Sequence, residues 1–354
     1  MKFHIPEDNN NNKSKCHLMH IGRSSTVCTD MQVHVHSVDR VSQAVYLGDV
    51  ISQDGSNTAN VKNRVSKGMG LVTTIMNLLQ TVSFGSKYFE IATTLRESLL
   101  INGMLTNSEI WYALKKKEIE ELQEVDKMLL RKILDAPTSA CVESLYLELG
   151  LVPIGIIIKA RRVNFYHYLV NLKNEEMLYK FFEAQLKNPC KDDWTLQALQ
   201  DFEDFGISSN KEFLKNKSKN AFKTIVKIKS KEFALNHLLN LKGTHSKMDN
   251  LAYSELKLQI YLRDEKIPIY EAKNLYRFRV RVANFKENFK GKYTSTGCPL
   301  CCVQIDTQAH SVQCDQMKMK IKMEGKYSDI FCSKIPIEIS KTLYKISKIR
   351  EDLI

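Results

Sequence analysis

Four residues in the last quarter of the chain have the types and spacing of a metal site. They are Cys298, Cys301, His310 and Cys314, in a C-x2-C-x8-H-x3-C pattern. Two thiolates in a tight turn can share one ion, and a histidine and a cysteine one helical turn apart can supply the other two corners of a tetrahedron. Because the protein fills all four corners, no position is left for water or substrate. The pattern therefore predicts a structural rather than a catalytic zinc ion.

Two alternatives stay open for this cluster. A buried cysteine pair with an incidental histidine would match part of the pattern, although a spacing that uses four residues favours zinc. Cys302 follows Cys301 directly and could replace it as a ligand. Gly297 and Pro299 flank Cys298, and they suit the tight turn that a zinc knuckle needs.

The composition indicates a folded, mainly helical protein with an anionic partner. The chain has 354 residues, of which 43% are hydrophobic and 26% charged, and it holds only 14 Gly and 7 Pro. So few turn-forming residues disfavour an all-β sandwich. The formal net charge of +12 favours nucleic acid over a membrane, since the basic residues recur along the chain and border no apolar anchor. A merely basic soluble protein is the alternative.

The cysteines and the hydropathy pattern bear on the cellular compartment. Nine cysteines are too few and too scattered for a disulfide scaffold in a chain of this length. The polar, Asn-rich first twenty residues do not have the pattern of a signal peptide, and no apolar run has the length of a membrane span. We therefore expect reduced thiols, a location in the nucleus, the cytoplasm or both, and no membrane partner.

The elements that must position the metal site are mostly helices. Alternating apolar and polar residues before residue 56 predict short strands, including a strand and turn at 45–55. From residue 60 on, apolar residues recur every three or four positions. This period predicts helices at 60–82, 87–111, 116–134, 142–149, 153–172, 175–186 and 337–349, with helical spacing through 211–242. The fold class is therefore mainly α, with a short β segment at its N-terminal end.

Three basic clusters are candidate nucleic-acid contacts. They are Lys127, Arg131 and Lys132; Lys159, Arg161 and Arg162; and Arg277, Arg279 and Arg281. A solvated helix face explains any one cluster, but together with the knuckle they favour phosphate contact, because guanidinium groups bind phosphate bidentately and lysines add screened attraction. The segment 211–242 is also dense in lysine.

Several segments, in chain order, resemble parts of the reverse transcriptases of non-LTR (LINE-type) retrotransposons. The run AVYLG at 44–48, followed by DGS at 54–56, resembles their primer grip, with Tyr46, Leu47 and Gly48 as its central residues. The segment 10–22 resembles the preceding palm motif, and 151–162 is similar to the thumb that follows the palm. The Cys/His cluster matches the C-terminal CCHC knuckle of the same polyproteins.

The resemblance implies a division of the chain into the end of a palm, a thumb and a zinc knuckle. It gives a palm remnant at 1–56, a helical thumb-like domain at 57–245, a basic helical connector at 246–290, a zinc knuckle at 291–318 and a C-terminal helical tail at 319–354. The implied fold is a thumb-like helical bundle with a β remnant and a small knuckle.

The same resemblance implies binding without catalysis. A polymerase of this family needs three metal-binding aspartates in palm motifs that would precede residue 10, so we expect no catalytic residue, no catalytic magnesium site and no polymerase activity from this chain alone. The implied ligands are RNA or DNA, as a template–primer duplex, single-stranded RNA or target DNA, with the missing palm as a further partner. A helical protein-interaction module with a purely structural zinc ion is the alternative.

Overall fold

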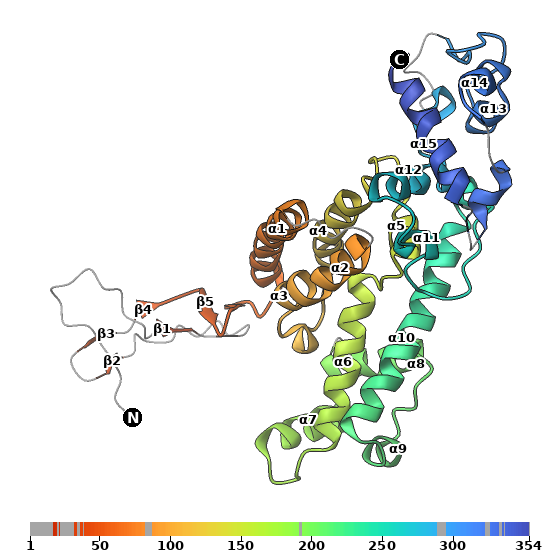
Figure 1. Cartoon of the computed structure of the whole chain (residues 1–354). Helices are drawn as coiled ribbons and strands as arrows, with labels where there is room; N and C mark the ends of the chain where they lie inside the picture. Colours follow the sequence, from red (N-terminus) through yellow and green to blue (C-terminus); the bar gives the residue numbers. More distant parts are fainter. Residues whose placement is uncertain are drawn as a thin grey trace.

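The computed structural model is mainly helical, and its strands lie to one side of the helical body (Figure 1). It describes residues 17–19, 21, 32–33, 36–37, 39–81, 87–190, 193–288, 295–322, 326–332, 335 and 337–353. The prediction of a mainly α fold is confirmed.

The strands are short and precede residue 53. They are β1 (His17–Leu18), β2 (Gln32–Val33), β3 (His36–Ser37), β4 (Asp39–Arg40), β5 (Gln43–Tyr46) and β6 (Asp49–Ser52). β1 pairs with β4 in parallel, whereas β2 with β3 and β5 with β6 are antiparallel. The predicted strand and turn at 45–55 thus overlaps the hairpin β5–β6, in which Tyr46 pairs with Asp49.

The first helical group packs around α1 and α4. Its members are α1 (Thr58–Thr81), α2 (Tyr88–Leu95), the π-helix η2 (Arg96–Ile101), α3 (Asn102–Met104), the 3-10 turn η3 (Ser108–Ile110), α4 (Lys116–Leu134) and α5 (Val142–Leu149). The bounds predicted for α4 and α5 agree with the structure. The helix predicted at 87–111 ends earlier, since a π-helical segment interrupts it and Asn107 has a left-handed backbone, with φ of +61°.

The second group is built on two long helices. It comprises α6 (Ile154–Val170), α7 (Met177–Lys187), α8 (Trp194–Asp204), α9 (Lys211–Lys215) and α10 (Lys219–Lys242). α6 and α10 lie side by side, with α7 and α9 at one end of the pair (Figure 1). The helical spacing through 211–242 is divided into two helices, because Ser218 caps α10 and its Oγ accepts a hydrogen bond from the Ala221 N–H.

The last group carries the predicted metal ligands. It comprises η4 (Ser246–Met248), α11 (Ile260–Arg263), α12 (Ile269–Arg279), η5 (Lys286–Asn288), α13 (Gln308–Gln313), α14 (Asp315–Lys320), η6 (Tyr327–Phe331) and α15 (Ile337–Glu351). α12 packs against α15, and the Ser340 hydroxyl donates a buried hydrogen bond of 2.8 Å to Glu271. One apolar core runs through all three groups of helices.

Candidate metal centre and basic groove

The four predicted metal ligands meet in space. One ligand atom each from Cys298, Cys301, His310 and Cys314 lies within 4.8 Å of the others. Cys298 and Cys314 are buried, and the Nε2 atom of His310 lies 3.3 Å from the Sγ atom of Cys301. The prediction of a cluster that could hold a metal ion is confirmed.

The turn at 298–302 places the first two thiols. The N–H of Cys298 donates to the carbonyl of Gln304 at 2.8 Å, and the N–H of Cys302 donates to the carbonyl of Cys298 at 2.9 Å. These bonds close a tight loop with both thiols on its inner side. Cys302 has a left-handed φ of +57°, is exposed and lies outside the cluster. Of the two adjacent cysteines, it is therefore Cys301 that the fold presents to an ion.

The short helix α13 places the other two ligands. The hydroxyl of Thr307 caps the helix by accepting the N–H of His310 at 2.9 Å. The N–H of Cys314 donates to the carbonyl of His310 at 2.7 Å, so these ligands stand one helical turn apart on the same face. This is the separation that the sequence spacing predicts.

The donor set decides which class of metal fits. Three sulfurs and one imidazole nitrogen suit zinc, whereas magnesium and calcium prefer oxygen ligands. Hydrogen bonds from the backbone N–H groups of Gln304 and Val303 lower the pKa of Cys301 to about 6. Burial raises the pKa of Cys298. A metal binds the thiolate form, which Cys301 adopts more readily than Cys298.

Buried hydrogen bonds attach the metal-binding loop to the helical body. Arg350 on α15 forms a bidentate ion pair with Asp306, at 2.6 and 2.7 Å, and both side chains are buried. The amide of Gln308 donates to the carbonyl of Phe278 at 2.6 Å and to the hydroxyl of Tyr327 at 2.8 Å. The metal centre is thus continuous with α12, η6 and α15.

Two of the predicted nucleic-acid contacts lie in the interior. Arg162 is 7% exposed and donates to Asp201 at 2.9 Å. Arg279 is 2% exposed and donates to Glu148 at 3.1 Å. A buried guanidinium that already has a carboxylate partner is not available to a phosphate. Arg162 and Arg279 are therefore not part of a nucleic-acid-binding surface.

The other two members of the second cluster also make contacts within the fold. Lys159 pairs with Asp204 and lies 3.6 Å from Asp201. Arg161 donates to the side chain of Asn102 at 3.0 Å and to a backbone carbonyl, and it is half-buried. The hydrogen bonds of Arg161 hold α6 against α3, while part of its side chain still reaches the surface.

The remaining predicted contacts lie nearer to solvent. Arg277 donates to the backbone carbonyl and the carboxylate of Asp135, at 2.9 and 2.6 Å. Lys127 pairs with Glu124 at 2.7 Å on the surface of α4. The other three are Arg131 and Arg281, both half-buried, and Lys132, which is exposed.

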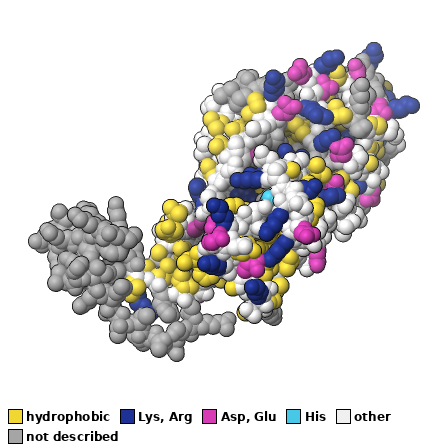
Figure 2. Space-filling view, turned by 90° about the horizontal axis from the view of Figure 1, so that it is seen from below, with side chains coloured by type: hydrophobic (Ala, Val, Ile, Leu, Met, Phe, Trp, Pro, Cys, Tyr) yellow, Lys and Arg dark blue, Asp and Glu magenta, His cyan; other side chains and the backbone are white. Residues whose placement is uncertain are grey.

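A different set of basic side chains lines a groove between α6 and α10. The groove has a volume of about 670 Å³. Its basic lining residues are Arg161, Lys223, Lys227, Lys231, Lys257 and Arg263. Among the described lining residues Glu97 is the one acid. We call this hollow the basic groove. Figure 2 shows Lys and Arg side chains spread over one face of the helical body, with hydrophobic and acidic ones between them.

The sequence prediction of site residues missed the lysines of α10, although their spacing in the sequence marks them. Lys219, Lys223, Lys227 and Lys231 recur every four residues, which places them along one side of a helix. Lys219 and Lys223 also line a second hollow beside His167, which extends the basic surface toward α9. Spacing, rather than the density of charge, would have found this stripe.

The predicted primer-grip residues form the tip of the hairpin β5–β6. Leu47 and Gly48 have left-handed backbones, with φ of +48° and +86°, and the side chains of Tyr46 and Leu47 are exposed. The hairpin is held to α1 by an ion pair of 2.6 Å between Asp49 and the buried Arg64. The tip is therefore an exposed apolar surface on an anchored base.

No protein-family model, curated protein or solved structure matches this chain. The segment 10–15, which belongs to the palm resemblance, lies outside the described residues. Among the described residues, no helix combines the length and apolar character needed to cross a bilayer.

Proposed function

We propose that the chain binds nucleic acid through its phosphate backbone, along the basic groove, and that a structural zinc ion holds its C-terminal region. The observation that carries this proposal is the set of Lys223, Lys227 and Lys231. They line one wall of the groove, and no described carboxylate lies within ion-pair distance of them. Lysines left unpaired beside one another repel each other, and a bound polyanion relieves that repulsion.

The dimensions of the lysine stripe suit a short stretch of backbone. From Lys219 to Lys231 an α-helix rises about 18 Å, which is about five steps along one nucleic-acid strand at about 3.4 Å each. Lysine contacts to phosphate add affinity without reading sequence. The proposed binding is therefore strongly salt-dependent and weakly sequence-specific.

The resemblance to non-LTR retrotransposon reverse transcriptases supports the same proposal. It makes RNA and RNA–DNA hybrid the first ligands to test, and it makes the knuckle a second contact to nucleic acid. The proposal concerns binding alone. It requires no catalytic residue or magnesium ion from this chain.

Replacing Lys223, Lys227 and Lys231 together by Gln tests the proposal. Each lost phosphate contact reduces the slope of log affinity against log salt by about 0.9 for a duplex or about 0.7 for a single strand. We expect the triple variant to bind about tenfold or more weakly at low salt, with a slope smaller by about 2 to 3. Fluorescence anisotropy of labelled RNA and hybrid duplex, titrated against salt, measures both.

The matched control replaces Lys117, Lys180 and Lys187, which are exposed and lie outside the groove. It changes the net charge by the same amount and should leave most of the affinity and slope intact. Equal losses in the two triple variants would show that net charge, not the groove, drives binding. Absence of binding by the wild-type chain would reject the proposal.

One observation favours the alternative, a protein-interaction module. An apolar hollow of about 410 Å³ lies between α6, α7 and α8, and the nearby side chains of Met177 and Phe181 are 73% and 67% exposed. Exposed apolar surface of this kind occurs at protein interfaces. Binding of a protein at this face would persist at high salt, whereas groove binding would not, so the salt titration separates the two functions.

A further inference from the structure

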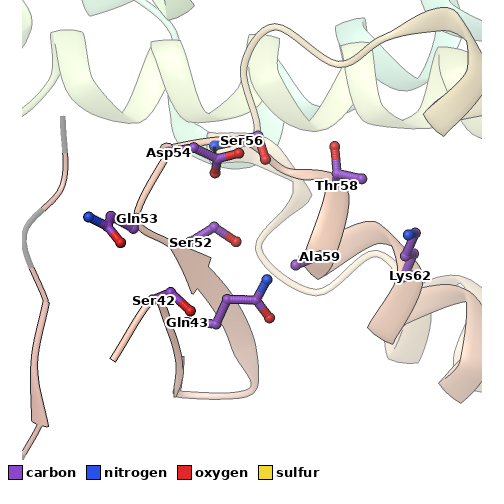
Figure 3. Close-up of a pocket in the computed structure, with 9 residues that line it drawn as sticks. All are labelled: Ser42, Gln43, Ser52, Gln53, Asp54, Ser56, Thr58, Ala59 and Lys62. Carbon is purple, nitrogen blue, oxygen red and sulfur yellow. Dashed lines mark hydrogen bonds between the residues drawn. The ribbon is translucent and has the colours of Figure 1, made fainter. Parts of the chain in front are cut away.

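A separate hollow, unused by the proposed function, lies between the hairpin β5–β6 and the start of α1. It has a volume of about 840 Å³, and Ala59 is the one apolar residue among the described residues that line it (Figure 3). The lining residues are Ser42, Gln43, Ser52, Gln53, Asp54, Ser56, Thr58, Ala59 and Lys62. Figure 3 shows the side chains of Gln43 and Ser52, one from each strand, on the side that faces the first turn of α1, whereas Gln53 points away from it.

Ser52 is the unusual member of this lining. It is 5% exposed, and its buried hydroxyl has no hydrogen-bond partner. Figure 3 shows the hydroxyl at the end of β6, pointing into the space in front of Ala59. Folded proteins rarely leave a buried hydroxyl unpaired, because its lost hydration is then not replaced. A ligand atom in the hollow would supply the missing partner.

The first turn of α1 supplies positive potential to the same space. α1 has 24 residues, and the N–H groups of a helix's first turn have no acceptor within the helix. Among the described residues, no side chain accepts a hydrogen bond from these N–H groups. The hydroxyl of Thr58 donates to Glu118 at 2.6 Å, and the side-chain oxygen of Asn60 accepts from the Val50 N–H at 3.1 Å.

Lys62 stands one helical turn further along α1 and is exposed at the hollow. No described carboxylate forms an ion pair with it. Asp54 is the one acid among the lining residues; it is exposed, and its carboxylate accepts the N–H of Ser56 at 3.0 Å. The helix start and Lys62 favour an anion, and the Asp54 charge on the rim opposes one.

We propose that this hollow is a phosphate-binding site. The N–H groups at the start of α1, the ammonium of Lys62 and the hydroxyl of Ser52 bind the phosphate oxygens. A helix start with a neighbouring lysine and hydroxyl is a general means of binding phosphate. The phosphate can belong to a free phosphate or mononucleotide, or to the end of a nucleic-acid strand.

Titration of the full chain with inorganic phosphate at constant ionic strength, followed by NMR of backbone amides at residues 52–62, tests the site. We expect Lys62→Gln to weaken binding about tenfold, and Asp54→Asn to strengthen it several-fold by removing an opposing charge. Lys67→Gln is the matched control, because Lys67 is exposed on the same helix outside the hollow, and it should change nothing.

Ser52→Ala gives a signature that a merely structural role would not produce. Because the hydroxyl has no partner without ligand, the variant should keep the wild-type Tm in phosphate-free buffer and yet bind phosphate more weakly. A fall in Tm without phosphate would mean that the hydroxyl is paired within the fold. That result, or equal phosphate affinity in the wild type and in Lys62→Gln, would overturn the proposal.

Oligonucleotides with a 5′-phosphate or a 5′-hydroxyl identify the source of the phosphate. A preference for the phosphorylated strand that Lys62→Gln abolishes assigns the site to strand ends. Dependence on Lys62 for inorganic phosphate or a mononucleotide alone assigns it to free phosphates. The oligonucleotide comparison and the phosphate titration are repeated with the triple lysine variant of the basic groove. This distinguishes loss of binding in the groove from loss of binding at the phosphate site.

Discussion

At the scale of single residues, five of the described arginines are buried, and each pairs with a carboxylate: Arg64, Arg96, Arg162, Arg279 and Arg350. Arg96 is fully buried and forms a bidentate ion pair with Asp126, at 2.6 and 2.7 Å. The hydroxyl of Tyr146 and the carbonyl of Val152 complete the network, each at 3.0 Å. This network ties η2 to α4, to α5 and to the segment before α6.

Removing one member of a buried pair leaves the other charge without a partner. Asp126→Ala should therefore lower the free energy of unfolding by about 3–5 kcal/mol. Glu124→Ala, on the exposed face of the same helix, removes only a surface pair with Lys127 and should cost at most about 1 kcal/mol. Urea denaturation of both variants measures the difference. Similar losses would show that the Arg96 network contributes little.

Asp201 makes stability depend on pH. Burial raises its pKa to about 6, and this outweighs the opposite effects of Arg162 and Lys159. Because the folded-state pKa lies above the unfolded value of about 3.9, the native chain binds more protons between these values, and stability falls as pH rises from about 4 to about 6. We expect a loss on the order of 3 kcal/mol, which Asp201→Asn should abolish.

Urea denaturation at several pH values measures this dependence. The matched control is Glu203→Gln, which changes an exposed acid of the same helix. In this variant the free energy of unfolding should depend on pH as it does in the wild type. Stability that rises between pH 4 and 6 in the wild type but not in Asp201→Asn would contradict the sign of the effect.

The basic clusters show what sequence could not predict at this scale. Arg162 and Arg279 looked like surface charges because neighbouring residues in the chain are also basic. Their partners lie 39 and 131 residues away, so only the tertiary fold reveals the pairing. Conversely, Lys223, Lys227 and the half-buried Lys231 lie on one side of α10 for a local reason, the helical period, which can be read from the sequence.

At the scale of elements, local patterns predicted most helices well. The bounds of α4 follow from the apolar period, and the helix ends before the segment Ala136-Pro137. The π-helical segment η2, whose Arg96 is buried against α4, was not predicted. Likewise, the division between α9 and α10 depends on two polar caps within a continuous apolar period.

The hairpin tip carries a test of local strain. Leu47 has a left-handed backbone, which costs a non-glycine residue about 1 kcal/mol, whereas Asn-Gly is the preferred pair in a two-residue hairpin turn. Leu47→Asn should therefore raise the free energy of unfolding by about 1 kcal/mol. Thermal and urea denaturation measure it. Tyr46→Asn, at a β-strand position, should lower stability, and an equal effect of both changes would argue against strain at Leu47.

At the scale of the whole molecule, the Cys/His cluster is tied to the helical body through the buried pair of Asp306 and Arg350, and a bound ion would stabilise this region. Cys298→Ala should abolish stoichiometric zinc binding in the purified protein. The control is Cys302→Ala, which changes a cysteine outside the cluster and should leave zinc binding intact. Removal of zinc by a chelator should speed hydrogen exchange in α13 and, through Asp306 and Arg350, in α15. Exchange in α1–α10 should stay the same.

The spacing of the four residues predicted that their side chains meet, because all four lie within seventeen residues and their separation is set by one turn and one short helix. Zinc retained by the Cys298→Ala variant would mean that the cluster does not bind the ion as described. The same would follow if the chelator left the rate of hydrogen exchange in α13 unchanged. The attachment of the centre to α12 and α15 was not predictable, since it depends on Arg350, far along the chain.

The fourfold spacing of the lysines on α10 also has a geometric consequence. Residues four apart do not lie parallel to a helix axis; their row is inclined to it by about 26°. A strand whose phosphates contact Lys219, Lys223, Lys227 and Lys231 in turn therefore crosses α10 obliquely. Such a strand would run mainly along α10 but tilted from its axis, and this tilt would set the direction in which a longer strand leaves the protein.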